Sequence, residues 1–145
     1  NILVWFATLV ALASGLNDVG VLKWIGKGTE SYLSGLTPTM LMISMIVFFF
    51  ILHYFFASLT AHTTALLPIF VVIAAKLIAP EQLMTFMILL TSAIGLMGII
   101  TPYGTGPSPI WYGAGYISQG RWWALGAIFA LIFMSVLILG VVIFV

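Results

Sequence analysis

Two polar stretches interrupt otherwise apolar sequence and hold the side chains best suited to chemistry. One is residues 58–64, Ser-Leu-Thr-Ala-His-Thr-Thr, and the other is residues 101–109, Thr-Pro-Tyr-Gly-Thr-Gly-Pro-Ser-Pro. The second stretch has three prolines and two glycines, which are residues that interrupt helices. Irregular backbone at membrane depth is tolerated only where protein or a water-filled cavity surrounds it. We call these stretches the first break and the second break, and together they predict a binding site.

The chemistry available at the two breaks is hydrogen-bond donation by hydroxyls and backbone amides. The hydroxyl side chains are Ser58, Thr60, Thr63, Thr64, Thr101, Tyr103, Thr105 and Ser108. The acidic residues Asp18, Glu30 and Glu81 lie at or near the ends of apolar segments, so none suits an intramembrane proton relay or cation site. We predict helices that start near Thr63 and Ile110, with free N–H groups that suit anions such as carboxylates.

His62 is the side chain in the breaks that titrates near neutral pH, so it could carry a positive charge beside an anionic ligand. The alternative is a neutral histidine whose ring bonds to a nearby hydroxyl or carbonyl. His53 lies inside an apolar run, where we expect it to pack between helices. Two histidines without an acidic partner form neither a nucleophile–base pair nor a metal cluster. An intramembrane enzyme is therefore disfavoured, and we predict neither a metal nor a cofactor.

Composition places the chain in a membrane. Its 145 residues are 63% hydrophobic and 5% charged, with a mean hydropathy of +1.30, whereas soluble domains carry about 25% charged residues. The net charge of +1 is too small to indicate a nucleic-acid partner. The absence of cysteine excludes disulfides, thiol catalysis and thiolate metal sites within the chain.

The apolar segments predict an all-α integral membrane protein in contact with the lipid bilayer. Its parts are a span over 2–22, an interfacial segment over 23–36, a helical hairpin over 38–78 with its tip at 58–63, a broken (discontinuous) span over 82–118 with its loop at 101–109, and a terminal span over 122–145. The hairpin is either re-entrant or two full crossings, because a span needs about 20 residues. Since Asn1 lies inside an apolar run, we expect the chain to be the C-terminal part of a larger membrane protein.

Both breaks also have a simpler interpretation, as kinks packed against neighbouring helices. Membrane helices often contain Ser and Thr, so this alternative applies most readily to the first break. The density of proline and glycine in the second break favours a functional role there. As kinks, the breaks would indicate a structural or channel-like membrane subunit.

The same residues carry a family resemblance. Ser58-Leu59-Thr60-Ala61 resembles the second Ser-Asn-Thr signature of the divalent anion/sodium symporter family, and residues 101–107 resemble its Thr-Pro loop. The order of spans also matches the C-terminal one of that family's two inverted repeats. The resemblance therefore implies a transporter half with a re-entrant hairpin and a discontinuous transmembrane helix. It also implies an elevator mechanism, a homodimer, and an N-terminal repeat outside this chain.

One residue departs from the family signature. Leu59 stands where the signature has Asn, and a leucine cannot coordinate a cation. The sequence Ser-Leu-Thr-Ala-His is more similar to the branch of bacterial citrate or tartrate:succinate antiporters and plastid 2-oxoglutarate/malate translocators. This branch is implied to exchange di- or tricarboxylates without sodium. A sodium-coupled dicarboxylate symporter is the alternative within the family.

The resemblance assigns roles residue by residue. Ser58 and Thr60 are implied to contact a substrate carboxylate, and the loop facing them is implied to be lined by Thr101, Pro102, Tyr103 and Gly104. His62 is a candidate for the positive charge that sodium would otherwise supply. The expected location is a bacterial inner membrane.

The membrane orientation has two conflicting predictions. Lys23, Lys27 and Lys76 fall on one side and Arg121 on the other, and the positive-inside rule places the lysines in the cytoplasm. The resemblance implies the reverse, with the hairpin entering from the outer side. We follow the resemblance.

Overall fold

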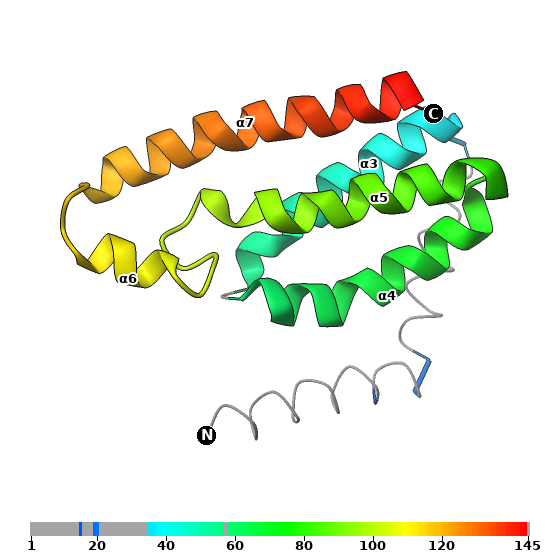
Figure 1. Cartoon of the computed structure of the whole chain (residues 1–145). Helices are drawn as coiled ribbons and strands as arrows, with labels where there is room; N and C mark the ends of the chain where they lie inside the picture. Colours follow the sequence, from blue (N-terminus) through cyan, green and yellow to red (C-terminus); the bar gives the residue numbers. More distant parts are fainter. Residues whose placement is uncertain (1–14, 16–18, 21–34, 57, 145) are drawn as a thin grey trace.

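The computed structural model of the chain describes residues 15, 19–20, 35–56 and 58–144. The predicted span over 2–22 and the interfacial segment over 23–36 lie almost entirely outside the described residues. The described part is helical and contains no strand (Figure 1). Its elements are α3 (Pro38–Leu52), the 3₁₀ turn η1 (His53–Phe55), α4 (Leu59–Leu77), α5 (Pro80–Leu96), the 3₁₀ turn η2 (Met97–Ile99), α6 (Ser108–Gly113) and α7 (Gln119–Phe144). The prediction of an all-α protein is confirmed.

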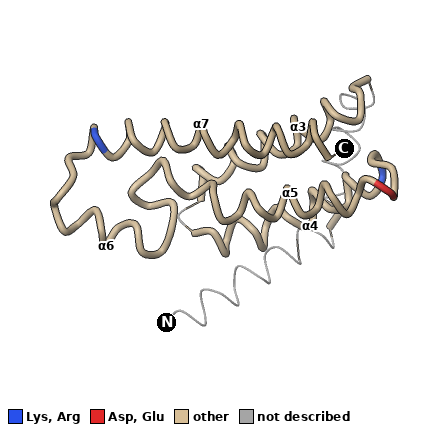
Figure 2. Tube along the Cα trace, turned by 45° about the horizontal axis from the view of Figure 1, so that its top comes forward, with Lys and Arg blue, Asp and Glu red and all other residues tan. Residues whose placement is uncertain are grey.

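Four stretches of the described chain are long and apolar enough to cross a membrane: Pro38–Phe55, Leu59–Leu77, Pro80–Ile99 and Gln119–Phe144. The charged residues of the described part lie at or near the ends of these stretches (Figure 2). Lys76 and Glu81 flank the turn between α4 and α5, and Arg121 lies near the start of α7. Charges at both ends and an apolar middle confirm an integral membrane protein. Since α3 together with η1 reaches span length, as does α4, a re-entrant hairpin stays a prediction.

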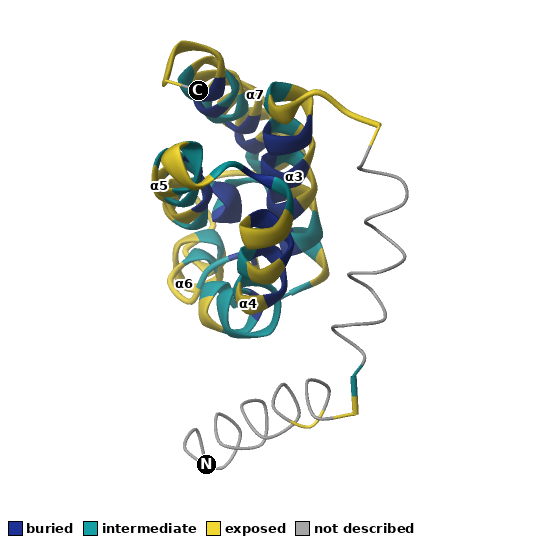
Figure 3. Cartoon of the chain, turned by 90° about the vertical axis from the view of Figure 1, so that its right-hand side faces the viewer, coloured by how far each residue is buried: buried dark blue, intermediate teal, exposed yellow. Residues whose placement is uncertain are grey.

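The helices pack with α3 and α5 in the middle and with α4 and α7 on either side (Figures 1 and 3). The core between them is apolar, and Met42, Phe49, Phe86 and Leu90 are fully buried. The outer faces are apolar as well, and along α7 they include Leu131, Val136 and Ile143. Helices that are apolar all round are typical of membrane spans.

Local sequence explains where α3 begins and where α6 ends. The Thr37 hydroxyl accepts the Met40 N–H at 3.4 Å, and Pro38 occupies the first turn of α3. A half-helix was expected to run from Ile110 to about residue 118, but α6 ends at Gly113 and α7 begins at Gln119. The reason is Gly115, whose φ of +78° leaves the helical region and ends the helix.

Helix α7 approaches the start of the second break at Gly126. A Cβ atom on Gly126 would lie 2.7 Å from the Ile99 carbonyl oxygen and 2.7 Å from the Ile100 Cα atom. Small residues let membrane helices approach this closely. The backbone of α7 therefore supports η2 and the residue that follows it.

Candidate functional site

The first break forms the N-cap and the first turns of α4, shortly after η1. The Phe56 N–H donates to the His53 carbonyl at 2.8 Å, and Phe56 itself is extended. Ser58 then caps α4, because its hydroxyl oxygen accepts the Ala61 N–H at 3.4 Å. The helix therefore starts at Leu59, and the prediction of a start near Thr63 is wrong. An N-cap serine can begin a helix earlier than the apolar pattern suggests.

Helix α5 gives way to η2 just before the second break. Gly98 adopts non-helical angles (φ −80°, ψ 19°), and the chain turns again where the Gly104 N–H donates to the Thr101 carbonyl at 3.3 Å. Gly104 is buried and has no room for a side chain: a Cβ atom would lie 2.8 Å from the Gly98 carbonyl oxygen and 2.9 Å from Thr101 Oγ1. Close contacts between backbone atoms thus shape the second break.

Hydroxyls lie where the helix restarts, near the end of the second break. Thr105 Oγ1 and Ser108 Oγ lie 2.6 Å apart, and the Ser108 N–H donates to Thr105 Oγ1 at 3.3 Å. Helix α6 begins at Ser108 rather than at Ile110. The two hydroxyls are therefore engaged with each other and with the backbone at this turn.

Two side chains of η1 bring the breaks together. His53 Nε2 donates to the Gly104 carbonyl at 2.8 Å, and the Tyr54 hydroxyl donates to the Met97 carbonyl at 2.5 Å. The Leu59 side chain also reaches the second break, because its Cδ2 atom lies 3.4 Å from where a Cβ on Gly98 would stand. The two breaks, separated in sequence by residues 65–100, are therefore neighbours in space.

His62 is enclosed by aromatic rings. It is fully buried, and its ring centroid lies 4.4 Å from that of Phe49, 5.2 Å from that of Phe56 and 5.3 Å from that of His53. Neither ring nitrogen makes a hydrogen bond to a described residue. The hydroxyl or carbonyl partner expected for a neutral histidine is therefore not found among the described residues. A role of His62 as a charge in place of sodium stays a prediction.

The predicted binding residues differ in exposure. They are the exposed Thr60 and Tyr103, the half-buried Ser58 and Pro102, and the buried Thr101 and Gly104. Thr60 and Tyr103 can therefore present hydroxyls to a ligand, whereas Thr101 Oγ1 is buried without a hydrogen-bond partner among the described residues. No hydrogen bond within the described part joins Ser58 or Thr60 to residues 101–104. The two breaks are held close to each other by the hydrogen bonds of η1 and by the Leu59 side chain.

The residues that join the breaks were missed by the sequence analysis. His53 was expected only to pack between helices, and Tyr54 and Gly98 were assigned no role. A hydrogen-bonding pair at the last turn of an apolar helix, just before a break, is a signal in the sequence. Its partners, carbonyls of the second break, could not be identified without the fold.

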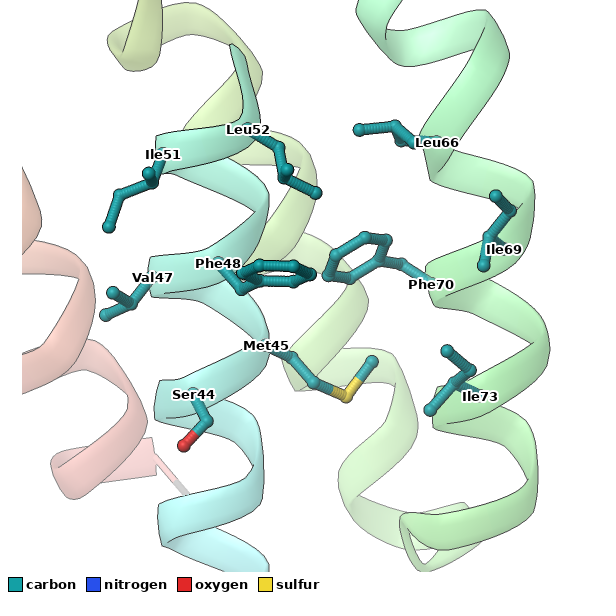
Figure 4. A pocket seen from close by; sticks show the side chains of 10 residues that line it. All are labelled: Ser44, Met45, Val47, Phe48, Ile51, Leu52, Leu66, Ile69, Phe70 and Ile73. Atoms are coloured by element: carbon teal, nitrogen blue, oxygen red, sulfur yellow. The ribbon is translucent and has the colours of Figure 1, made fainter. Parts of the chain in front are cut away.

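Two cavities in the described part differ in the polarity of their lining. A cavity of about 620 Å³ between α3 and α4 is lined by apolar side chains with one hydroxyl, that of Ser44 (Figure 4). A carboxylate would find almost no hydrogen-bond donor there. A smaller cavity of about 250 Å³ at the second break is lined in part by Thr105, Ser108 and Trp122. Size alone therefore does not identify the site, and the polar groups lie at the breaks.

Comparison with known proteins identifies a family and several curated relatives. The family model described as "Sodium:sulfate symporter transmembrane region" matches residues 1–144. An L-tartrate/succinate antiporter of Escherichia coli (strain K12) is 51% identical over 140 residues, which cover 96% of this chain and 28% of the relative. The L-tartrate/succinate antiporters of Shigella boydii serotype 4 (strain Sb227) and of Escherichia coli O6:K15:H31 (strain 536 / UPEC) are 51% and 50% identical over the same shares.

The chain thus spans little more than a quarter of the length of these relatives. Its relatives are transporters and not enzymes, and they are bacterial. Together with the four helices of the described part that could span a membrane, this supports an integral inner-membrane protein. It belongs to the sodium:sulfate symporter family, also known as the divalent anion/sodium symporter family.

Proposed function

We propose that the full-length protein exchanges one dicarboxylate for another across the membrane, with tartrate and succinate as the first pair to test, and with citrate, malate and 2-oxoglutarate as further candidates. The observation that carries the proposal is the 51% identity to L-tartrate/succinate antiporters over 96% of the chain. In this proposal the chain is the C-terminal repeat of the transporter, and the N-terminal repeat completes the site.

The first break supplies the donors for a substrate carboxylate. Thr60 presents an exposed hydroxyl. Because Ser58 Oγ accepts from Ala61, its own O–H is free to donate elsewhere. The first N–H groups of α4 have no carbonyl partner within the helix and lie at the positive end of its dipole. This end of α4 is therefore suited to a negative charge.

The second break supplies the opposite side of the substrate site. Tyr103 is 42% exposed and offers a hydroxyl donor. Thr101 and Gly104 are buried and determine the shape of the turn that carries Tyr103. The ring of Pro102 fixes its own φ angle within this turn. We assign substrate contact to Tyr103 and shape to its neighbours.

Leu59 favours exchange over sodium symport. Its side chain is half-buried beside Gly98, so an apolar group occupies this part of the first break. A hard cation requires oxygen ligands, and the Leu59 side chain has none. Sodium-coupled symport would need ligands from the N-terminal repeat or from backbone carbonyls, and it stays the second candidate.

Elevator transport by a homodimer completes the proposal. The hydrogen bonds from His53 and Tyr54 hold the two breaks together. A site whose two sides are bonded to each other is suited to travel as one body rather than to open between them. We propose that α3, α4, α5 and the second break move together with the substrate.

Transport by the purified full-length protein in proteoliposomes tests the proposal. We expect uptake of labelled succinate only when unlabelled tartrate or succinate is inside, and equally in sodium and in potassium buffers. Uptake into empty vesicles that requires a sodium gradient would overturn exchange in favour of symport. Absence of any carboxylate transport, with passive flux of unrelated solutes, would favour a channel-like subunit.

A further inference from the structure

The 3₁₀ turn η1 holds the second break by two neighbouring side chains. His53 donates from Nε2 to the carbonyl of Gly104, at 2.8 Å, and Tyr54 donates from its hydroxyl to the carbonyl of Met97, at 2.5 Å. One carbonyl lies inside the turn of residues 101–104, and the other lies before it, at the start of η2. The two bonds therefore anchor the second break and η2, the turn that precedes it.

We infer that His53 is a positioning residue for substrate binding: its hydrogen bond to Gly104 holds the turn of residues 101–104 against the hairpin, so that Tyr103 and the donors of the first break face the same carboxylate. This inference rests on the proposed function. It concerns a residue that lies outside both breaks and that touches the substrate site only through Gly104.

The geometry at Gly104 explains why this bond sets the shape of the turn. The Gly104 N–H is bonded to the Thr101 carbonyl, and a side chain on Gly104 would collide with the Gly98 carbonyl. The remaining polar group of this buried residue is its carbonyl, and His53 is the partner. Without that donor the carbonyl would be buried and unpaired, which favours a rearranged turn.

The imidazole of His53 is itself held in one orientation. Its ring is edge-on to His62 at a centroid distance of 5.3 Å and an interplanar angle of 83°, and edge-on to Tyr54 at 5.7 Å and 66°. Since a carbonyl can only accept, the proton must be on Nε2. His62 belongs to the first turns of α4, so His53 contacts the start of one arm of the hairpin while bonding to the second break.

A packing role alone makes a different prediction. If the ring mattered only as filler, then any planar or aliphatic group of similar size would serve. If the bond matters, then the position of the donor decides the outcome. Gln and Asn separate the two cases, because the Gln side-chain nitrogen lies near the position of Nε2 and the Asn nitrogen near that of Nδ1.

The experiment compares His53→Gln and His53→Asn in the full-length protein. Two measurements are made: the KM and kcat of tartrate/succinate exchange in proteoliposomes, and hydrogen–deuterium exchange of the peptide containing residues 101–106. We expect His53→Asn to raise KM roughly five- to tenfold, as befits one lost hydrogen bond, and to speed amide exchange in the turn. His53→Gln should restore both values to within about twofold of the wild type.

Two further variants act as controls. Ser92→Ala removes an exposed hydroxyl that bonds to the Ile88 carbonyl of its own helix, and it should change neither measurement. Tyr54→Phe removes the neighbouring bond and should lower the thermal midpoint without speeding amide exchange in residues 101–106. Equal effects of His53→Gln and His53→Asn on amide exchange, or unchanged exchange in both, would overturn the inference. Because amide exchange needs no transport, a wild type that fails to transport would refute the proposed function alone.

Discussion

The two breaks interrupt the membrane helices by different physical means. Side chains determine the structure of the first break: Ser58 caps α4, and the His62 ring packs against the rings of His53 and Phe56, which precede the break. In the second, backbone contacts dominate, because Gly98 and Gly104 lie too close together for any side chain. The first break can therefore change its chemistry by substitution, whereas the second can change little without changing its shape.

The largest effect should come from adding a methyl group to the second break. Gly104→Ala places a Cβ atom 2.8 Å from the Gly98 carbonyl oxygen, which is backbone and cannot move aside cheaply. We expect a loss of about 1–3 kcal/mol of stability and a fall in exchange of more than about tenfold. Thermal unfolding and proteoliposome exchange measure the two effects.

Gly106→Ala is the matched control for that substitution. It lies two residues further along the same loop, with nothing within 4 Å of its added Cβ. We expect near wild-type exchange. Comparable damage from both alanines would mean that flexibility of the loop, and not the contact between Gly98 and Gly104, is what the second break requires.

A smaller effect, confined to affinity, is expected in the first break. Thr60→Val removes an exposed hydroxyl while keeping the shape of the side chain. We expect KM for succinate to rise roughly five- to tenfold, with the thermal midpoint unchanged. Thr91→Val is its control, because the Thr91 hydroxyl is exposed and bonds to the Met87 carbonyl of its own helix. A KM unaffected by Thr60→Val would remove this hydroxyl from the site.

Ser58→Ala should affect both stability and affinity. Loss of the N-cap costs a helix about 0.5–2 kcal/mol, and loss of the hydroxyl removes a donor to the substrate. A Gly residue at position 58 keeps much of the capping while it also lacks the donor. We therefore expect Ser58→Gly to regain thermal stability without regaining KM, and recovery of both would assign Ser58 a capping role alone.

The smallest effect concerns pH and His62. If this ring supplies the charge that sodium supplies elsewhere in the family, that charge is present at low pH and is lost as pH rises, so exchange weakens with rising pH. We expect His62→Gln to flatten the profile after correction for titration of the substrate itself. A mutant profile that parallels the wild type would assign His62 to the aromatic packing around Phe49 and Phe56.

Much of the fold follows from local properties of the sequence. The excess of apolar residues predicts membrane helices, and Thr37-Pro38 indicates the start of α3. Helix α4 starts before the predicted Thr63, because Ser58 caps the helix ahead of the polar residues that follow it. The pairing of His53 with Gly104 could not be predicted, because it depends on how η1 meets a turn 51 residues away.

The candidate site was predictable in type rather than in arrangement. Hydroxyls such as Thr60 and Tyr103 can be recognised as donors from their polarity in an apolar chain. Burial of Thr101, in contrast, follows from the packing of the turn and has no signature in the sequence. Residues that donate to carbonyls are hard to find from sequence, since every residue carries a carbonyl.

The approach of α7 at Gly126 has a consequence for natural variation. This residue lies outside both breaks, yet its Cα hydrogen faces the backbone of Ile99 and Ile100. A missense change to any larger residue would push α7 away from Ile99 and Ile100, and would thereby disturb the second break, which follows directly in the chain. Among related genes, we therefore expect substitutions of this glycine to abolish function, although its codon belongs to the terminal helix and to neither break.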